Sequence, residues 1–120
     1  FTAVELLRKD IDFLDFHIYR WGAKGTGEDV FKHFADNMKL TTPEAQKLMK
    51  SKPVIMGEYG SFKKEEASLD EAIVFVKELD EAALEFGFKG TCYWTMRCFE
   101  QTRLWNLCWE NEKMLKAFSE

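Results

Sequence analysis

The stretch PVIMGEYG, residues 53–60, is decisive for the fold because an apolar, β-rich run ends there in a carboxylate flanked by glycines. Two runs of similar character lie on either side of it, IDFLDFHIY at residues 11–19 and GTCYWTM at residues 90–96. Helical patterns separate the three runs. Such alternation predicts βαβ units and a parallel sheet, and therefore an α/β fold.

Short helices are expected before the second strand. One covers about residues 28–38, and another begins at Pro43 with Thr42 as its N-cap. The apolar residues within positions 4–7 are interpreted as the end of a helix that is already under way. The connection between the first two strands is long enough for a crossover.

The longest helix is expected over about residues 68–86. Ser68 and Glu71 match a capping box, and Gly87 is a natural stop. A last helix is expected over about residues 110–118. The long helix carries an apolar stripe of helical period, made of Leu69, Ala72, Ile73, Val76, Leu79, Ala83 and Phe86.

The strand starts at residues 11, 53 and 90 have a spacing close to the roughly 30 residues per unit of a (β/α)8 barrel of about 250 residues. Three units cannot close a barrel. An open doubly wound sheet is compatible with the strand count, but its Gly-rich phosphate turn is absent. Because the chain also starts at Phe1 rather than Met, we expect residues 1–120 to be part of one larger barrel domain.

Composition excludes some classes of function. The 120 residues are 46% hydrophobic and carry a net charge of −4, without clustered basic residues, so no nucleic-acid partner is expected. No apolar run approaches the roughly 20 residues of a membrane span, so no membrane partner is expected. Cys92, Cys98 and Cys108 lack CxxC spacing and are interpreted as buried or free thiols. We expect neither a metal nor a cofactor.

Polar and aromatic side chains gather at the strand ends, where barrels place their sites. His17 and Tyr19 end the first strand, Glu58 ends the second and Trp94 ends the third. If side chains alternate strictly along each strand and these faces all point into the barrel, the four groups meet at one end of the barrel. The expected shared faces are His17 with Tyr19, Val54 with Met56 and Glu58, and Cys92 with Trp94 and Met96. The inward face would also bear Phe13.

Glu58 is the most informative of these residues, because a carboxylate after an apolar strand costs several kcal/mol unless hydrogen bonds or function compensate. Gly57 and Gly60 are expected to leave room for a turn and for a ligand. A hydroxyl donated by Tyr19 would hold the carboxylate ionised and oriented. A structural salt bridge at Glu58, and a core position for His17, remain as alternatives at this point.

The four tryptophans have different interpretations. Trp94 is either a core residue or a platform at the rim of a polar pocket. Trp21, Trp105 and Trp109 could line such a pocket, but helix packing and loop anchoring are favoured for them.

At these residues the chain resembles the last three strand units of glycoside hydrolase family 5, the cellulase and mannanase type of (β/α)8 barrel. DFHIY resembles the His-x-Tyr end of strand six, PVIMGEYG resembles the nucleophile strand seven, and GTCYWTM resembles the strand-eight tryptophan. The resemblance covers essentially all of the chain and implies the C-terminal part of a retaining endo-β-1,4-glycanase, secreted or at the cell surface.

The same resemblance implies a role for each strand-end residue. Glu58 would be the nucleophile, Tyr19 its hydrogen-bond donor, His17 a residue lining the site, and Trp94 the platform under the sugar. The family's acid/base glutamate, which follows an Asn on strand four, has no counterpart in this chain. Because a retaining mechanism needs two carboxyl groups roughly 5 Å apart, the chain alone is not expected to hydrolyse glycans efficiently.

Two alternatives belong to other classes of protein. A non-catalytic carbohydrate-binding barrel would keep Trp94 and Glu58 for recognition only. A plain α/β interaction domain would use Glu58, His17 and Tyr19 as a structural network, and it predicts no open cleft beside them. Besides a β-linked oligo- or polysaccharide, the expected partner is the N-terminal half of the barrel or, failing that, another copy of the chain.

Overall fold

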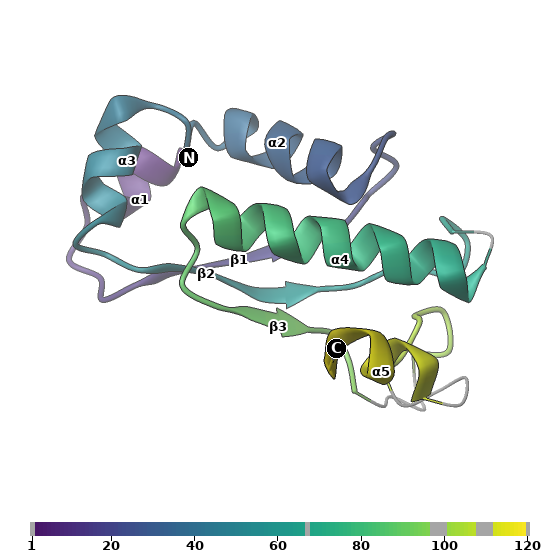
Figure 1. Cartoon of the computed structure of the whole chain (residues 1–120). Coiled ribbons are helices and arrows are strands. Elements are labelled where there is room, and N and C mark those ends of the chain that lie inside the picture. Colours follow the sequence, from purple (N-terminus) through teal and green to yellow (C-terminus); the bar gives the residue numbers. More distant parts are fainter. Residues whose placement is uncertain (1, 67, 97–100, 108–111, 120) are drawn as a thin grey trace.

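The structure is a computed structural model that describes residues 2–66, 68–96, 101–107 and 112–119. It contains one parallel sheet in the order β1-β2-β3 (Figure 1). The strands are β1 (Leu14–Ile18), β2 (Val54–Tyr59) and β3 (Thr91–Tyr93), and the helices are α1 (Ala3–Leu7), α2 (Gly27–Asn37), α3 (Pro43–Met49), α4 (Leu69–Phe86) and α5 (Lys113–Ser119). The predicted α/β fold with a parallel sheet is confirmed.

Helices α3 and α4 begin after their predicted N-caps, and α4 ends at its predicted glycine. The Thr42 side chain accepts a hydrogen bond from the Ala45 N–H at the start of α3. The Ser68 side chain accepts one from the Glu71 N–H at the start of α4. Gly87 ends α4 in the left-handed conformation, with φ 114°, which a glycine adopts without strain.

Helix α1 differs from the prediction. It is a short helix that begins at Ala3, not the end of a longer one. The reason is a reciprocal cap, in which the Thr2 N–H donates to the Glu5 carboxylate (2.6 Å) and the Glu5 N–H donates to the Thr2 hydroxyl (3.4 Å). The hydrogen bond from Thr2 lowers the pKa of the Glu5 carboxyl.

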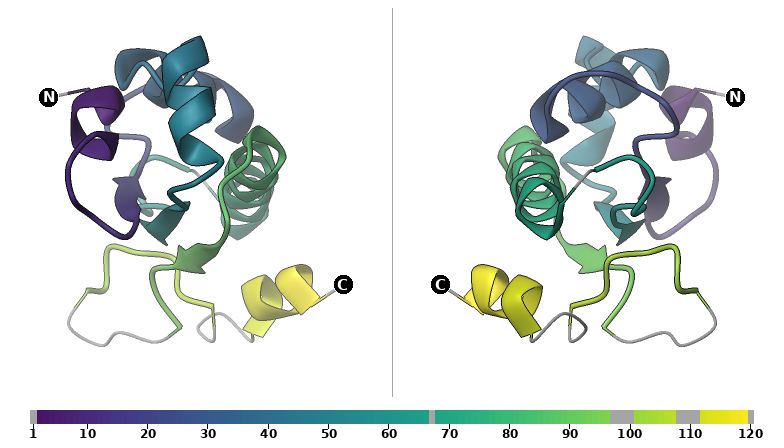
Figure 2. Two further views of the ribbon diagram at one scale, coloured as in Figure 1. Left: turned by 90° about the vertical axis from the view of Figure 1, so that its left-hand side faces the viewer. Right: turned by 90° about the vertical axis from the view of Figure 1, so that its right-hand side faces the viewer.

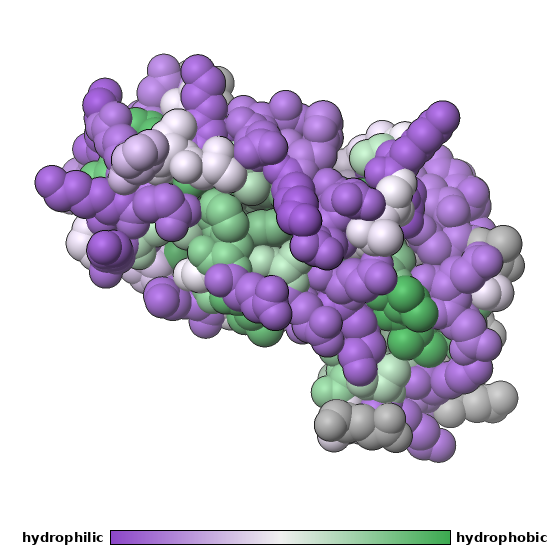
Figure 3. Space-filling view, turned by 45° about the horizontal axis from the view of Figure 1, so that its top comes forward, coloured by the Kyte–Doolittle hydropathy of each residue, from purple (hydrophilic) through white to green (hydrophobic). Residues whose placement is uncertain are grey.

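Helices α1 to α4 form an arc on one side of the strands (Figure 2). Helices α2 and α4 pack against each other, and α5 contacts α4 next to β3. Most of the helical side is hydrophilic, and apolar side chains show between the hydrophilic ones (Figure 3). The largest fully buried apolar side chains, which mark the core between helices and sheet, are Leu7, Phe31, Leu40, Val54, Met56, Val76, Leu79 and Met114.

The sheet is open, and its strands follow one another in chain order. β1 and β3 lie at its two edges, and neither has a second strand partner within the described residues. No reversal of strand order occurs in the described sheet, whereas a doubly wound sheet reverses its order at the ligand site. This strand order is the one expected for consecutive βα units of a barrel.

Strand β2 contains a β-bulge, which overturns the predicted alternation. Asp15 pairs with Ile55 but His17 pairs with Glu58, so β2 has one more residue than β1 between these pairs. β2 also has one more residue than β3 between their two pairs, Met56 with Thr91 and Tyr59 with Tyr93. Val54 and Met56 therefore face the helical core, with 1% and 0% of their surface exposed, while Glu58 lies on the opposite face.

The face of the sheet away from the core is less apolar than predicted. The expectation that Val54 and Met56 belong to it is wrong, because the bulge directs them to the helices. Phe13 and Cys92 do remain exposed, Phe13 by 53%.

None of the described helices combines the length and the apolar character that crossing a membrane requires.

Candidate active site

The carboxylate of Glu58 lies at the C-terminal end of β2. Two side chains contact it, that of His17 in β1 and that of Tyr19, which directly follows β1. The Tyr19 hydroxyl donates a hydrogen bond of 2.8 Å to Oε1. The His17 Nδ1 lies 3.4 Å from Oε2. These contacts form because β1 and β2 are parallel neighbours, and their carboxyl ends meet at one edge of the sheet.

Tyr19 is suited to act as a lasting hydrogen-bond donor. Only 6% of its surface is exposed. Burial raises the pKa of Tyr19 well above its ordinary value of 10, and the hydrogen bond to Glu58 raises it further. The phenol therefore stays protonated throughout the physiological pH range and keeps donating to Glu58.

Asp15 supports the bulge that aims Glu58, and sequence reasoning missed it. Its Oδ1 accepts a hydrogen bond of 2.8 Å from the Gly57 N–H, the extra residue of β2. Its Oδ2 lies 3.7 Å from the His17 Nε2, so carboxylates flank the imidazole on both sides. The signal was a charged residue two positions before His17 in an otherwise apolar strand, and therefore on the same face.

The two glycines around Glu58 make room for protein atoms rather than for a ligand. A Cβ at Gly57 would lie 2.2 Å from the Asp15 Oδ1. A Cβ at Gly60 would lie 2.5 Å from the Trp94 carbonyl oxygen and 3.3 Å from the Tyr19 ring. The prediction that these glycines leave room for a ligand is therefore wrong, because the Asp15 side chain, the Trp94 carbonyl group and the Tyr19 ring take up that space.

A cavity of about 490 Å³ opens beside Glu58, within the usual size range of small-ligand sites. Trp94 forms part of its wall, and its indole N–H donates to the Gln101 side chain (2.6 Å). His17 contacts Glu58 but faces a neighbouring hollow. The cavity is lined by Tyr19, Trp21, Glu58, Phe62, Trp94, Gln101, Thr102, Arg103 and Leu104.

The structure thus brings the four strand-end residues together. Tyr19, Glu58 and Trp94 share the cavity, and His17 reaches Glu58 from its side. An interaction domain with a purely structural network predicted no cleft beside Glu58, and the cavity contradicts that alternative.

The remaining tryptophans divide between two environments. Trp21 lines the cavity and is 73% exposed, so the prediction that it packs a helix or anchors a loop is wrong. Trp105 packs against the core, and the Lys63 ammonium lies 4.8 Å from its ring centre, which fits the predicted anchoring role. Trp109 lies outside the described residues.

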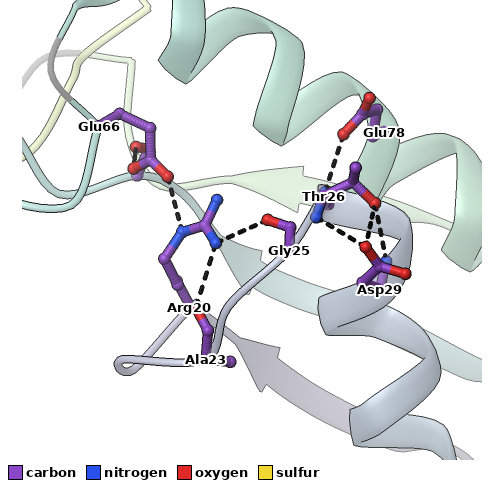
Figure 4. Close-up of polar contacts among 9 residues, drawn as sticks. Arg20, Ala23, Gly25, Thr26, Asp29, Glu66 and Glu78 are labelled. Carbon is purple, nitrogen blue, oxygen red and sulfur yellow. Dashed lines mark hydrogen bonds and ion pairs between the residues drawn. The ribbon is translucent and has the colours of Figure 1, made fainter.

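Arg20 fixes the loops that carry the site (Figure 4). Its Nε donates to the Glu66 Oε1 (2.7 Å), and Glu66 in turn accepts a hydrogen bond of 2.5 Å from the Ser61 hydroxyl. The guanidinium also lies 4.2 Å from the ring centre of Phe75 in α4. Because Arg20 follows Tyr19, and Ser61 comes shortly after Glu58, this buried network holds the two strand ends in place.

The same guanidinium organises the loop before α2. Its Nη1 donates to the carbonyl oxygens of Ala23 (3.1 Å) and Gly25 (2.8 Å). The N-terminus of α2 is then tied to α4 by a hydrogen bond from the Gly27 N–H to Glu78 (2.9 Å) (Figure 4).

Metal-ligating side chains do not cluster in the described part of the chain, where no group of three or more His, Cys, Asp or Glu residues could hold an ion. Cys92 is an exposed free thiol. Cys98 and Cys108 lie outside the described residues.

Comparison with known proteins shows what this arrangement is similar to. The chain matches no protein-family model and no curated protein by sequence. Among solved structures, an endoglucanase superposes with a TM-score of 0.55 over 99% of this chain, at 19% sequence identity. The endo-β-1,4-mannanase from Thermotoga petrophila superposes with a TM-score of 0.52 over 77% of it, at 22% identity.

The chain has the fold of part of a glycanase. It covers 45% of the endoglucanase and 19% of the mannanase, less than half the length of either. The resemblance to part of a cellulase- or mannanase-type barrel is thereby confirmed at the level of the fold.

Proposed function

We propose that this glycanase-like chain contributes strands six to eight of a (β/α)8 barrel and carries the nucleophile, Glu58, of a retaining β-1,4-glycan hydrolase. One observation carries the proposal. The Glu58 carboxylate lies at the C-terminal end of a parallel strand, beside a cavity, with the Tyr19 hydroxyl 2.8 Å from one of its oxygens. Barrels place their catalytic groups at this end of their strands.

The geometry supports attack by the second carboxylate oxygen. Tyr19 occupies Oε1 and fixes the orientation of the carboxylate. The His17 Nδ1 is 3.4 Å from Oε2, longer than an ordinary hydrogen bond to a charged oxygen, so Oε2 is available to the anomeric carbon. The new bond to Glu58 forms as the glycosidic C–O bond breaks and the leaving oxygen takes a proton from an acid; water then releases the sugar.

Trp94 is proposed as the platform for the sugar that is attacked. Its indole lies in the cavity wall with Glu58, and Gln101 anchors it through the ring N–H. A sugar ring that stacks on the indole would be held in position for the reaction. Such positioning lowers the activation barrier by several kcal/mol when the reacting atoms are aligned. The similar structures, a mannanase and an endoglucanase, favour a β-linked mannan or glucan as the substrate.

The proton donor is proposed to be a carboxylic acid outside these 120 residues, supplied by the remaining units of the barrel. Among the described residues, Glu58 is the only carboxylate that lines the cavity. The same observation favours a second candidate function, carbohydrate binding without catalysis, in which Glu58 and Trp94 only recognise the glycan.

A mechanism-based label separates the two candidates. A 2-fluoro glycoside with a dinitrophenyl leaving group needs little help from an acid, so the chain alone can be tested. We expect its fluorosugar to be attached to Glu58, as located by peptide mass spectrometry, and Glu58→Gln to abolish labelling because an amide cannot attack.

The matched control is Glu65→Gln, which removes a carboxylate from the loop after β2 and should leave labelling unchanged. Labelling of a different carboxylate contradicts the assignment of the nucleophile. Reversible binding of the glycoside without any labelling favours the binding function.

A further inference from the structure

Trp21 is exposed in a way that core packing does not explain. At 73%, it has the largest exposed fraction among the large hydrophobic side chains that the structure describes. Its backbone φ is 47°, in the left-handed region that a bulky residue seldom adopts. An exposed indole on such a backbone fits a residue kept for contact with a ligand, because strained positions gather at binding sites.

Phe62 and Trp21 form an aromatic wall on the cavity that contains Glu58. The two ring centres are 5.7 Å apart at an angle of 50°, and each ring also contacts Tyr19. None of these contacts is a parallel stack, and 73% of Trp21 stays exposed despite them. We call Trp21 and Phe62 the second wall, Trp94 being the first.

The second wall comes from two loops that are fixed independently of a ligand. Trp21 follows Arg20, which is anchored by Glu66 and by two carbonyl groups. Phe62 follows Ser61, which is bonded to the same Glu66, and Phe62 also pairs with Leu104 through an isolated β-bridge. A preorganised aromatic surface loses little conformational entropy when a ligand binds.

We propose that the second wall binds one pyranose ring of a β-1,4-linked oligosaccharide, next to the ring over Trp94. Pyranose rings have C–H groups on their faces and hydroxyl groups at their edges. The cavity offers the matching chemistry, because aromatic rings of Trp21, Phe62 and Trp94 and polar groups of Glu58, Gln101, Thr102 and Arg103 line the same space. The inference rests on the proposed function and deepens it, because it makes Trp21 and Phe62 determinants of specificity for the length of the glycan.

Binding to the unaltered chain can be measured by isothermal titration calorimetry with mannotetraose, cellotetraose and the corresponding methyl β-monosaccharides. Trp21→Ala should weaken tetrasaccharide binding about tenfold, the upper end of what an aromatic contact contributes. It should leave monosaccharide binding unchanged, since one ring occupies only the place over Trp94. Trp21→Phe, which keeps a stacking surface, should retain most of the affinity.

Phe13→Ala is the matched control, because Phe13 is also exposed but lies before the start of β1, at the other end of the strand. Tetrasaccharide binding that is unchanged by Trp21→Ala overturns the second wall but leaves Glu58 as the proposed nucleophile. A loss that is equal for mono- and tetrasaccharides also overturns it, since a separate ring would then not be involved.

Two further outcomes would overturn the second wall. If the unaltered chain binds neither tetrasaccharide, the wall is not a sugar site, and fluorosugar labelling of Glu58 tests the proposed function separately. If light scattering shows a dimer that Trp21→Ala converts to a monomer, the wall is covered by a second copy of the chain instead.

Discussion

Gly57→Ala is the sharpest test of the bulge that aims Glu58. The new Cβ would lie 2.2 Å from the Asp15 Oδ1 and 2.5 Å from its Oδ2, so the Asp15 carboxylate must move. Because that carboxylate is the exposed end of a side chain and can turn aside, the overpacking should cost about 1 kcal/mol, the lower end of the range for core positions. The hydrogen bond from the Gly57 N–H to Asp15 would also be lost, which adds about 1 kcal/mol because the Asp15 side chain is 40% exposed. We expect a total destabilisation of about 2 kcal/mol.

Asp15→Ala provides the second arm of a double-mutant cycle. Alone, it removes the hydrogen bond and should cost about 1 kcal/mol. In its presence Gly57→Ala should cost little, because the atoms that clash with the new methyl group are gone. The two substitutions should therefore be coupled by about 2 kcal/mol, as read from urea unfolding of the four proteins followed by circular dichroism.

The reasoning about the bulge would be refuted by additivity. If the double variant is destabilised by the sum of the single effects, Asp15 and Gly57 do not share the contact that the structure shows. A Gly57→Ala protein within about 0.5 kcal/mol of the unaltered chain would lead to the same conclusion, because ordinary surface substitutions stay within that range.

Two further predictions concern the buried groups around the site. Arg20→Met should lower the free energy of unfolding by about 3 kcal/mol, because it leaves Glu66, only 5% exposed, without its cation. Adding Glu66→Gln should restore much of this stability in the same urea assay. No recovery in the double variant would contradict a buried ion pair. The three tyrosines should resist ionisation, because burial raises the pKa of Tyr19, Tyr59 and Tyr93 above 10. Their contribution to stability is complete below about pH 10 and falls as the pH rises further, since the unfolded chain then loses protons that the folded chain retains. Tyrosinate absorbance should accordingly appear together with the loss of circular dichroism, and gradual ionisation of a chain that stays folded would contradict this.

Much of the fold was predictable because its signals are local. Ser68, Gly87 and an apolar stripe define α4, and the β-rich runs locate all three strands. The face of Glu58 was harder, because strict alternation puts Glu58 with Val54 and Met56. The bulge separates them, and its signal was the glycine inside the strand, which often marks a bulge or a close approach of another group.

The residues of the candidate site were likewise predicted only in part. Tyr19 and Glu58 were paired correctly because both lie at the ends of neighbouring parallel strands, where geometry leaves few choices. Trp21 was misjudged, since nothing in a local sequence distinguishes a buried indole from one that faces a cavity. Asp15 was missed because its partner, the N–H of Gly57, became available only through the bulge.

Arg20 and Trp21 suggest how the cavity could be engineered. The two residues are consecutive, yet the side chain of Arg20 is 16% exposed while Trp21 is 73% exposed as a residue. The loop therefore keeps its anchor whichever side chain occupies position 21. Glycine or asparagine would fit the φ of 47° with less strain, so a library screened only for thermal stability should discard the tryptophan. A library screened for glycan capture should recover it.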